Sequence, residues 1–395
     1  MKRPTWYQLA FALWAILIAV VCIKPLFKPF SGTVYITYAL AGEDFAEGRR
    51  LYNVNHPNTD NFRYLPVVAA GFAPLSQLPP GVGGSLWRVL GIALFLSGIA
   101  AWARQLRPGI PLPIVMLFAL PLSIGSLNNG QANTHVAGLM LWGCVLAGRG
   151  RWTVAALLIA GAALFKGYPI ALGGLLLLLA PLRFGIPLAI GVGIGIVLPA
   201  AFQSTDYVME QYRYLLANLE ADDRSSFPLW GGYQDAHMLL RIAGIAVSRD
   251  NIRFVQAGAG LLAAVVLWMS WKGGMTRMGA AANAYSLGAC WMCLFGPAVE
   301  ASTFILLAPV LAFELLATGS PRWAKLAASL SATFFLATVI LFALPHAVHR
   351  PVIALGILPI AAALLTVAAT GRILTVCSVA GNVTPPVEQE LRLAA

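Results

Sequence analysis

FALWAILIAVVCIKPLF, residues 11–27, holds a single charged side chain, Lys24. It lies within an apolar run over 7–27, and about 20 helical residues are enough to cross the hydrocarbon core of a bilayer. No small-residue cleavage site follows the run, so we interpret it as a retained span and not as a removed signal peptide. The stretch predicts a helix embedded in a membrane.

The whole chain has the same character. Its 395 residues are 59% hydrophobic and 10% charged, and the mean hydropathy is +0.77. Soluble domains carry about 25% charged residues, so a soluble fold could not bury this much apolar surface. Because only helices and closed barrels satisfy their backbone within lipid, we expect an all-α polytopic membrane protein. The net charge of +11 does not indicate a nucleic-acid partner, since the cations fall in short loops between apolar runs.

The apolar runs predict about twelve transmembrane helices. They cover 7–27, 84–102, 111–126, 133–147, 152–166, 168–182, 184–202, 253–271, 279–296, 303–318, 326–344 and 352–371.

A further apolar segment, YLPVVAAGFAPLSQLPP (64–80), is short and contains four prolines. We expect a re-entrant or interfacial helix there, because a crossing needs about 20 helical residues. The prediction is therefore one integral membrane domain over 1–372, with a first outer loop at 28–63 and a second at 203–252. A cytoplasmic tail over 373–395 follows.

Charges set the predicted orientation. The connections after every second run are short and basic, and the positive-inside rule places them in the cytoplasm. They carry Arg104, Arg107, Arg149, Arg151, Arg183, Lys272, Arg277, Arg322 and Lys325. Twelve of the fifteen carboxylates fall on the other face. We expect a multi-pass protein of the plasma (inner) membrane whose site faces the periplasm or exterior, because the cytoplasmic connections leave no room for one.

Neutral hydrogen-bonding residues gather on this outer face. SIGSLNNGQANTH (123–135) supplies Asn129, Gln131 and Asn133, which suit the hydroxyls of a sugar. WGGYQDAHMLLRIAG (230–244) closes the second outer loop and adds Gln234 and Asp235 as further substrate-binding candidates.

Two cations lie close to the outer ends of predicted spans. Arg88 lies in SLWRVLG (85–91), and Lys166 lies in LFKGYP (164–169), where Gly167 and Pro169 interrupt the helix. Ionisable groups in a membrane are costly and by default mark a function or a partner. We predict that both bind an anion such as a phosphate. The alternatives are snorkelling of Arg88 and a simple anchoring role for Lys166.

Three carboxylates are candidate catalytic residues. Asp60 lies in TDNFRYLP (59–66), where we expect desolvation to raise its pKa and make it a general base, with Arg63 and Tyr64 binding substrate beside it. The alternative is a simple pair between Asp60 and Arg63. Glu300, in FGPAVEAST (295–303), is expected to be a second essential carboxylate.

Asp44 is the third candidate. It lies in TVYITYALAGEDFAEGRRLY (33–52), whose apolar residues have helical spacing. The spacing predicts an amphipathic helix on the membrane surface, which is either a plain interfacial helix or a lid over a lipid substrate.

Metal and redox chemistry have no support in the sequence. The five cysteines are scattered, and the pair Cys290 and Cys293 lies in an apolar run without a second ligand pair. The histidines show no ligand spacing. We therefore predict no metal site and no cofactor.

At these motifs the chain resembles glycosyltransferase family 87, of the GT-C class of polytopic glycosyltransferases, over about residues 30–320. NFRYLPVVAAGFAPLSQLPP (61–80) resembles the family's aromatic-x-Tyr-x-Pro segment, NNGQAN (128–133) its Gly-Gln-x-Asn motif, and LFKGYP its Lys-x-x-Pro turn. The chain departs from the pattern where the family carries an acid four residues before a tyrosine. Here Val34, beside Thr33, precedes Tyr38, and GPAVEAST lacks the family's histidine.

The resemblance implies a GT-C-like bundle and a polyprenyl-phosphate-linked sugar donor, with mannose as the family's sugar. It implies transfer of a hexose to a lipid or glycan acceptor, with membrane lipids around the protein. Two alternatives stay open at this point. One is a polymerase or ligase of lipid-linked glycans, and the other is a transporter or flippase of lipid-linked sugar, for which we find no internal repeat.

Overall fold

The computed structural model describes residues 5–54, 56, 59–221, 224, 227–342 and 344–381. Within these ranges every regular element is a helix, which confirms the predicted all-α class. Seven helical segments are apolar and long enough to cross a membrane: Trp6–Phe27, Pro80–Gln105, Leu112–Asn129, Pro181–Ala201, Asn251–Lys272, Arg322–Phe342 and His349–Val376. The count of about twelve crossings stays a prediction.

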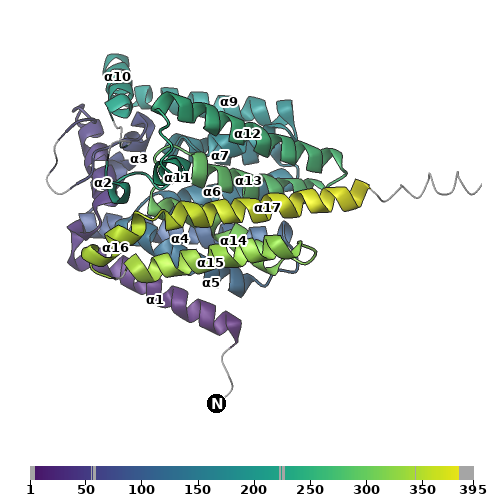
Figure 1. Cartoon of the computed structure of the whole chain (residues 1–395). Coiled ribbons are helices and arrows are strands. Elements are labelled where there is room, and N and C mark those ends of the chain that lie inside the picture. The colour runs from purple at the N-terminus through teal and green to yellow at the C-terminus, as the bar shows by residue number, and fades with distance from the viewer. Residues whose placement is uncertain are drawn as a thin grey trace, which may run out of the picture.

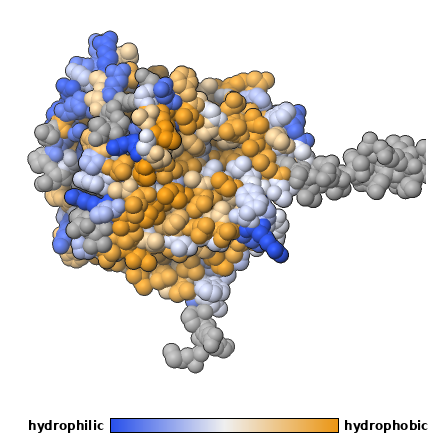
Figure 2. Space-filling view, in the orientation of Figure 1, coloured by the Kyte–Doolittle hydropathy of each residue, from blue (hydrophilic) through white to orange (hydrophobic). Residues whose placement is uncertain are grey.

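These segments belong to helices α1 (Trp6–Phe27), α4 (Pro80–Gln105), α5 (Leu112–Asn129), α9 (Pro181–Val197), α12 (Arg249–Lys272), α15 (Arg322–Phe342), α16 (His346–Ile353) and α17 (Ile357–Gly381). Most of them run side by side (Figure 1). An apolar band crosses the middle of the visible face and separates more hydrophilic ends (Figure 2). Large side chains such as Ile194, Leu262 and Ile340 are exposed on these outer helices, as expected where lipid is the solvent.

The centre of the bundle is formed by α6 (Asn133–Gly148) and α13 (Arg277–Phe295), which are buried on nearly every side. A helix that is buried all round needs small residues for close approach. Accordingly, a Cβ at Gly138 would lie 2.7 Å from the backbone of Leu94 on α4. Both central helices meet the polar stretches predicted from the sequence at one end. We call this end, which carries α2 (Thr33–Ala46), α10 (Thr205–Ala221) and α11 (Ala236–Ile242), the polar end (Figure 1).

The segment around LFKGYP departs from the predicted pair of full spans. Helix α7 (Trp152–Phe165) ends at the predicted break, and α8 (Ile170–Leu177) has only 8 residues. At about 1.5 Å per residue, α8 is about 12 Å long and cannot cross about 30 Å of hydrocarbon by itself. The predicted span over 168–182 is therefore wrong. Pro169 and the bend at 178–180 interrupt the helix on both sides of this apolar run.

The first predicted outer loop folds against the bundle. Helix α2 packs on α3 (Pro66–Ser76) and α4, and the predicted apolar positions Val34, Tyr38, Ala41 and Phe45 are all buried. The predicted helix is present, but its apolar side chains contact protein, and its place at the membrane surface stays a prediction. At 11 residues α3 is too short to cross a bilayer, which agrees with the prediction for 64–80.

The remaining elements complete the chain. They are the 3₁₀ turns η1 (Pro29–Ser31), η2 (Leu198–Ala201), η3 (Leu229–Gly231) and η4 (Ala301–Leu307), together with helix α14 (Ala308–Leu316). The predicted tail over 373–395 begins inside α17, which continues to Gly381, and 382–395 lie outside the described residues.

Candidate functional site

The turn between α5 and α6 positions the predicted amides. Gly130 ends α5 with φ 66° and ψ 34°, a left-handed conformation that glycine adopts without strain. A Cβ there would also lie 2.8 Å from the Cβ of Tyr35. After this turn the chain enters α6, so Gln131 and Asn133 lie one on each side of the start of a buried helix. The sequence requires glycine here because both the backbone angles and the available space exclude other residues.

Four side chains form one hydrogen-bonded network at this point. The Oε1 of Gln131 accepts from Asn133 Nδ2 at 2.7 Å and from Ser302 Oγ at 2.5 Å. Asn133 Nδ2 also donates to Ser302 Oγ at 3.0 Å, and the Asn133 Oδ1 accepts from Tyr168 OH at 3.2 Å. Because two donors occupy the oxygen of Gln131, its Nε2 is turned the other way. It donates to Glu300 Oε2 at 3.2 Å.

Glu300 is therefore held from two directions. Its side chain caps η4 by accepting from the backbone of Thr303, and the Thr303 hydroxyl accepts in turn from the Glu300 N–H at 3.3 Å. The second restraint is the Gln131 amide described above. The carboxylate nonetheless stays 43% exposed. An oriented carboxylate that still reaches solvent can accept a hydrogen bond or a proton from a substrate hydroxyl.

Two cations lie near this carboxylate. Lys166, at the break after α7, interacts electrostatically with Glu300, and its Nζ lies 6.0 Å from the ring centre of Tyr168. Arg224, in the second outer loop, places Nη1 3.9 Å from Glu300 Oε1, and its guanidinium lies 4.8 Å from the ring centre of Tyr233. The site thus combines one carboxylate, two cationic side chains and a network of neutral amides.

Aromatic side chains form one wall of the site. Tyr64 packs edge-on against Tyr38 with ring centres 4.9 Å apart, and Trp87 stacks on Phe165 at 5.6 Å and on His135 at 3.5 Å. Burial raises the pKa of Tyr64 to about 12, and the nearby Glu300 charge raises it as well. Tyr64 is therefore a neutral hydroxyl, which suits the predicted contact with a sugar.

Arg88 is bound to the backbone in this structure, and its predicted contact with a phosphate stays a prediction. It is buried, and three of its nitrogens donate to backbone carbonyls: Nε to Leu127 O at 2.7 Å, Nη1 to Gly84 O at 2.9 Å and Nη2 to Asn128 O at 2.8 Å. The last carbonyls of a helix lack partners within the helix and carry partial negative charge, so a buried guanidinium stabilises the end of α5. Asn129 lies at the same helix end, where its Oδ1 accepts from Asn128 Nδ2 at 3.4 Å. The structure brings neither residue into contact with Glu300.

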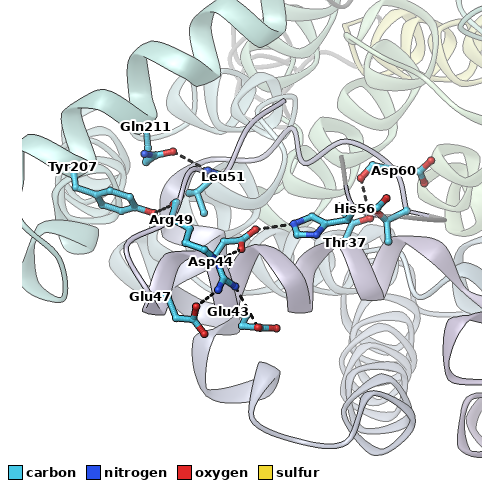
Figure 3. Close-up of polar contacts among 11 residues, drawn as sticks. Thr37, Glu43, Asp44, Glu47, Arg49, Leu51, His56, Asp60, Tyr207 and Gln211 are labelled. Carbon is cyan, nitrogen blue, oxygen red and sulfur yellow. Dashed lines mark hydrogen bonds and ion pairs between the residues drawn. The ribbon is translucent and has the colours of Figure 1, made fainter. Parts of the chain in front are cut away.

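Asp44 belongs to a separate cluster at the polar end (Figure 3). Its side chain is only 4% exposed, and Oδ1 accepts from Arg49 Nε at 2.8 Å while Oδ2 lies 2.9 Å from His56 Nε2. Arg49 also pairs with Glu43 and Glu47. Asp44 is thus buried between a guanidinium and an imidazole, and its catalytic role stays a prediction. We name Asp44, Arg49 and His56 the first-loop cluster.

Asp60 lies elsewhere again. Its backbone carbonyl accepts from Thr37 Oγ1 at 3.2 Å, and the residue is exposed (Figure 3). The protein itself does not bury Asp60, and its role as a base stays a prediction. Asp60 and Arg63 are both close enough to Tyr64 to act on it electrostatically.

Two candidates of the second outer loop flank the site. The backbone N–H of Gln234 donates to Val299 O at 2.8 Å, next to Glu300. Asp235 caps α11 by accepting from Met238 N at 3.1 Å, and burial raises its pKa. The Asp235 side chain is therefore occupied by the helix cap. Gln234, in contrast, contacts Val299, the residue that precedes Glu300.

Sequence reasoning did not single out four residues of the site. Tyr168, Ser302 and Tyr233 lie inside motifs that were selected, LFKGYP, FGPAVEAST and WGGYQDAHMLLRIAG, so the motifs pointed to their segments. Arg224 comes from the long second loop, where no motif or spacing pointed to it. Among the described residues, no group of three or more His, Cys, Asp or Glu side chains could hold a metal ion, and the prediction of no cofactor is not tested.

The fold and this site define an all-helical membrane protein with a polar, carboxylate-containing site at one end of the bundle. The chain belongs to glycosyltransferase family 87, whose family model matches residues 62–297. It is therefore a membrane glycosyltransferase, and the matched range includes both NNGQAN and LFKGYP.

Two solved structures are similar to the chain at low sequence identity. ArnT from Cupriavidus metallidurans in the apo state shares 16% identity with a TM-score of 0.38, covering 91% of this chain and 78% of that chain. The same protein bound to undecaprenyl phosphate shares 14% identity with a TM-score of 0.38, covering 93% of this chain and 78% of that chain. No curated protein matches the chain.

Proposed function

We propose that the protein transfers a hexose, mannose in the first instance, from a polyprenyl-phosphate-linked donor to a lipid or glycan acceptor. The reaction takes place on the extracytoplasmic face of the plasma membrane. The observation that carries the proposal is Glu300, oriented by the Gln131 amide and flanked by Lys166 and Arg224. A donor with a neutral sugar and a charged phosphate needs amides beside cations, and a hydroxyl acceptor needs a carboxylate.

In the proposed reaction the acceptor hydroxyl attacks the anomeric carbon, and its proton passes to the Glu300 carboxylate. The bond between the anomeric carbon and the phosphate oxygen breaks, and the polyprenyl phosphate leaves with the bonding electrons. Lys166 and Arg224 stabilise the negative charge that develops on this phosphate. Asp60, which is exposed at the polar end, is the second candidate for the base.

The orientation follows from charge. Arg277 Nε donates to Gly148 O at 2.9 Å, so two of the basic connections meet at the end opposite to the polar end. By the positive-inside rule this basic end is cytoplasmic, and the polar end then faces outward. Cysteine labelling at positions 56 and 235 in intact cells tests this arrangement, and labelling at both positions from the cytoplasm alone would contradict it.

The deciding experiment uses purified protein in liposomes supplied with labelled polyprenyl-phosphate mannose and a panel of lipid acceptors. We expect label to appear in the acceptor with wild-type protein and not with Glu300→Gln. The same assay with other hexoses on the same lipid identifies the sugar. Transfer from nucleotide sugars, but from no polyprenyl-phosphate sugar, would overturn the proposal.

A further inference from the structure

A cluster of buried charge lies at the basic end of the bundle, opposite to Glu300. The Nε of Arg372 donates to both carboxylate oxygens of Glu314 at 3.0 Å, and these two side chains are 6% and 1% exposed. Asn283 Oδ1 accepts from Arg107 Nη2 at 2.8 Å and from Arg372 Nη2 at 3.4 Å. We name Arg107, Asn283, Glu314 and Arg372 the basic-end cluster. None of the roles assigned above uses it.

Each member of the basic-end cluster comes from a different part of the bundle. Arg107 follows α4, Asn283 lies on α13, Glu314 on α14 and Arg372 on α17. The ring of Phe313, also on α14, has the guanidinium of Arg107 3.9 Å from its centre and that of Arg372 at 4.4 Å. The cluster therefore ties α14 to α17 directly, and to α13 and the end of α4 through the two guanidinium groups.

The choice of one register explains these charges better than stability does. A buried ion pair is often no more stabilising than apolar side chains of the same volume, and its best supported use is to select one arrangement of the elements that it joins. The preceding side chains of α14, Val310, Leu311 and Ala312, are buried hydrocarbon. Apolar faces have little hydrophobic preference for one register in a membrane, because lipid is as apolar as they are. The polar contacts of the cluster supply that preference.

Helix α14 continues directly into the segment that carries Glu300. Glu300 is the N-cap of η4 (Ala301–Leu307), and α14 (Ala308–Leu316) follows η4 without a break. Helix α13 is bonded to the same segment, since Tyr285 OH donates to Leu306 O at 3.0 Å. From the usual rises of 3₁₀ and α-helices, a helical path of about 24 Å joins Glu314 to Glu300. A displacement of α14 along its axis would therefore move the carboxylate of the site.

We propose that Glu314 and Arg372 are positioning residues for Glu300 and act on it through α14 and η4. The inference rests on the proposed function and adds to it the residues that set the place of the carboxylate. A slip of one residue along α14 amounts to about 1.5 Å. Added to the 3.2 Å contact between Glu300 and Gln131 Nε2, such a slip breaks the hydrogen bond.

The test replaces the ion pair by hydrocarbon, with Glu314→Met and Arg372→Met combined in the full-length protein. Because both partners are removed, neither leaves the other as an unpaired buried charge, and the double variant should fold. Arg372→Lys keeps the charge but not the planar guanidinium, and it takes the place of the double variant if that does not fold. The control is Ser331→Ala, which removes a buried hydrogen bond of 2.7 Å between α15 and α17. Monodispersity and the thermal midpoint show that the variants are folded.

Sugar transfer by protein in liposomes gives the first readout. We expect the double variant to lose about 10- to 100-fold in kcat while the donor KM stays near that of wild type, because the carboxylate is displaced and the donor-binding groups are not. Arg372→Lys should lose less, and the control should match wild type.

The loss should also be non-additive with that of Gln131→Ala, since both changes act on one contact, whereas distant residues are otherwise additive. A wild-type kcat in the folded double variant, or fully additive losses, would overturn the inference.

Hydrogen exchange measured by mass spectrometry gives a second readout that does not need activity. In the double variant the amides of η4 should exchange several-fold faster than in wild type, and in Ser331→Ala they should not change. Faster exchange confined to α14 and α17 would show that the cluster only holds the basic end together, which overturns the inference. A wild-type protein without transfer activity contradicts the proposed function instead, and the exchange of η4 then still decides whether the cluster positions Glu300.

Discussion

Two carboxylates at the polar end, Glu300 and Asp44, have opposite environments. Asp44 is 4% exposed and is paired at 2.8 Å with Arg49 and at 2.9 Å with His56. Glu300 is 43% exposed, accepts from a neutral amide at 3.2 Å, and has Arg224 at 3.9 Å. A carboxylate whose two oxygens are both bound by charged or ionisable partners serves the fold, whereas one that is oriented and still accessible can serve a substrate.

The largest effect in this comparison is expected for Glu300→Gln. The substitution keeps the shape of the side chain but removes the proton acceptor, so transfer should fall about 10²- to 10⁴-fold. The measurement is sugar transfer by purified protein in liposomes. Near-normal turnover in Glu300→Gln, with a dead Asp60→Asn, would move the base to Asp60.

The next largest effect is expected for Lys166→Met, which removes one of the two cations near Glu300. If Lys166 binds the donor phosphate as proposed, loss of this half-buried charge should cost about 2–5 kcal/mol in donor binding or transition-state stabilisation. The KM for donor and kcat, measured separately, show which is affected. Arg88→Gln is the matched comparison, because Arg88 binds the end of α5 and should lower stability more than donor affinity. An equal rise in donor KM for both variants would contradict this distinction.

Asp44→Asn should leave catalysis nearly intact and reduce stability instead. The substitution removes the charge between Arg49 and His56, and we expect a loss of about 1–3 kcal/mol in the free energy of unfolding. Thermal denaturation in detergent, with the exposed Glu47→Gln as control, measures it. An inactive Asp44→Asn with a wild-type midpoint would place Asp44 in the catalytic machinery and break the comparison.

The smallest effect is expected for Ser302→Ala. The hydroxyl donates to Gln131 Oε1 and accepts from Asn133, so its loss loosens the amide that orients Glu300 without removing it. One hydrogen bond of this kind contributes about 0.5–1.5 kcal/mol, which corresponds to a few-fold lower kcat. Steady-state kinetics at saturating donor would detect it, and a loss as large as that of Glu300→Gln would mean that Ser302 contacts the substrate itself.

The sequence predicted the class of fold, because the length of the apolar runs indicates helices in a membrane. It also placed the amides of NNGQAN and the acid of FGPAVEAST on the same outer face. In the structure Gln131 and Glu300 lie 3.2 Å apart, a contact that was not predicted.

Side-chain partners could not be predicted in the same way. Arg88 was expected to bind a ligand, but the end of α5, 39 residues further on, supplies its acceptors. Asp44 was predicted to be a catalytic candidate on a helix, and the spacing did not show that Arg49 and His56 bind its carboxylate. Both outcomes depend on long-range packing or on loop conformation, which spacing along the chain does not encode. The break after α7 was recognised, but the shortness of α8 was not.

The shortness of α8, which follows the break after α7, has a consequence for the surrounding membrane. Ile170, Leu177 and Leu178 are exposed on or directly after α8, which is about 12 Å long. Lys166 lies in the break between α7 and α8. Lipids beside α8 meet a hydrophobic surface thinner than their own hydrocarbon, and a bilayer adapts to such mismatch by thinning locally. Thicker bilayers resist this deformation, so we expect the acyl-chain length of the surrounding membrane to affect the break after α7 that carries Lys166.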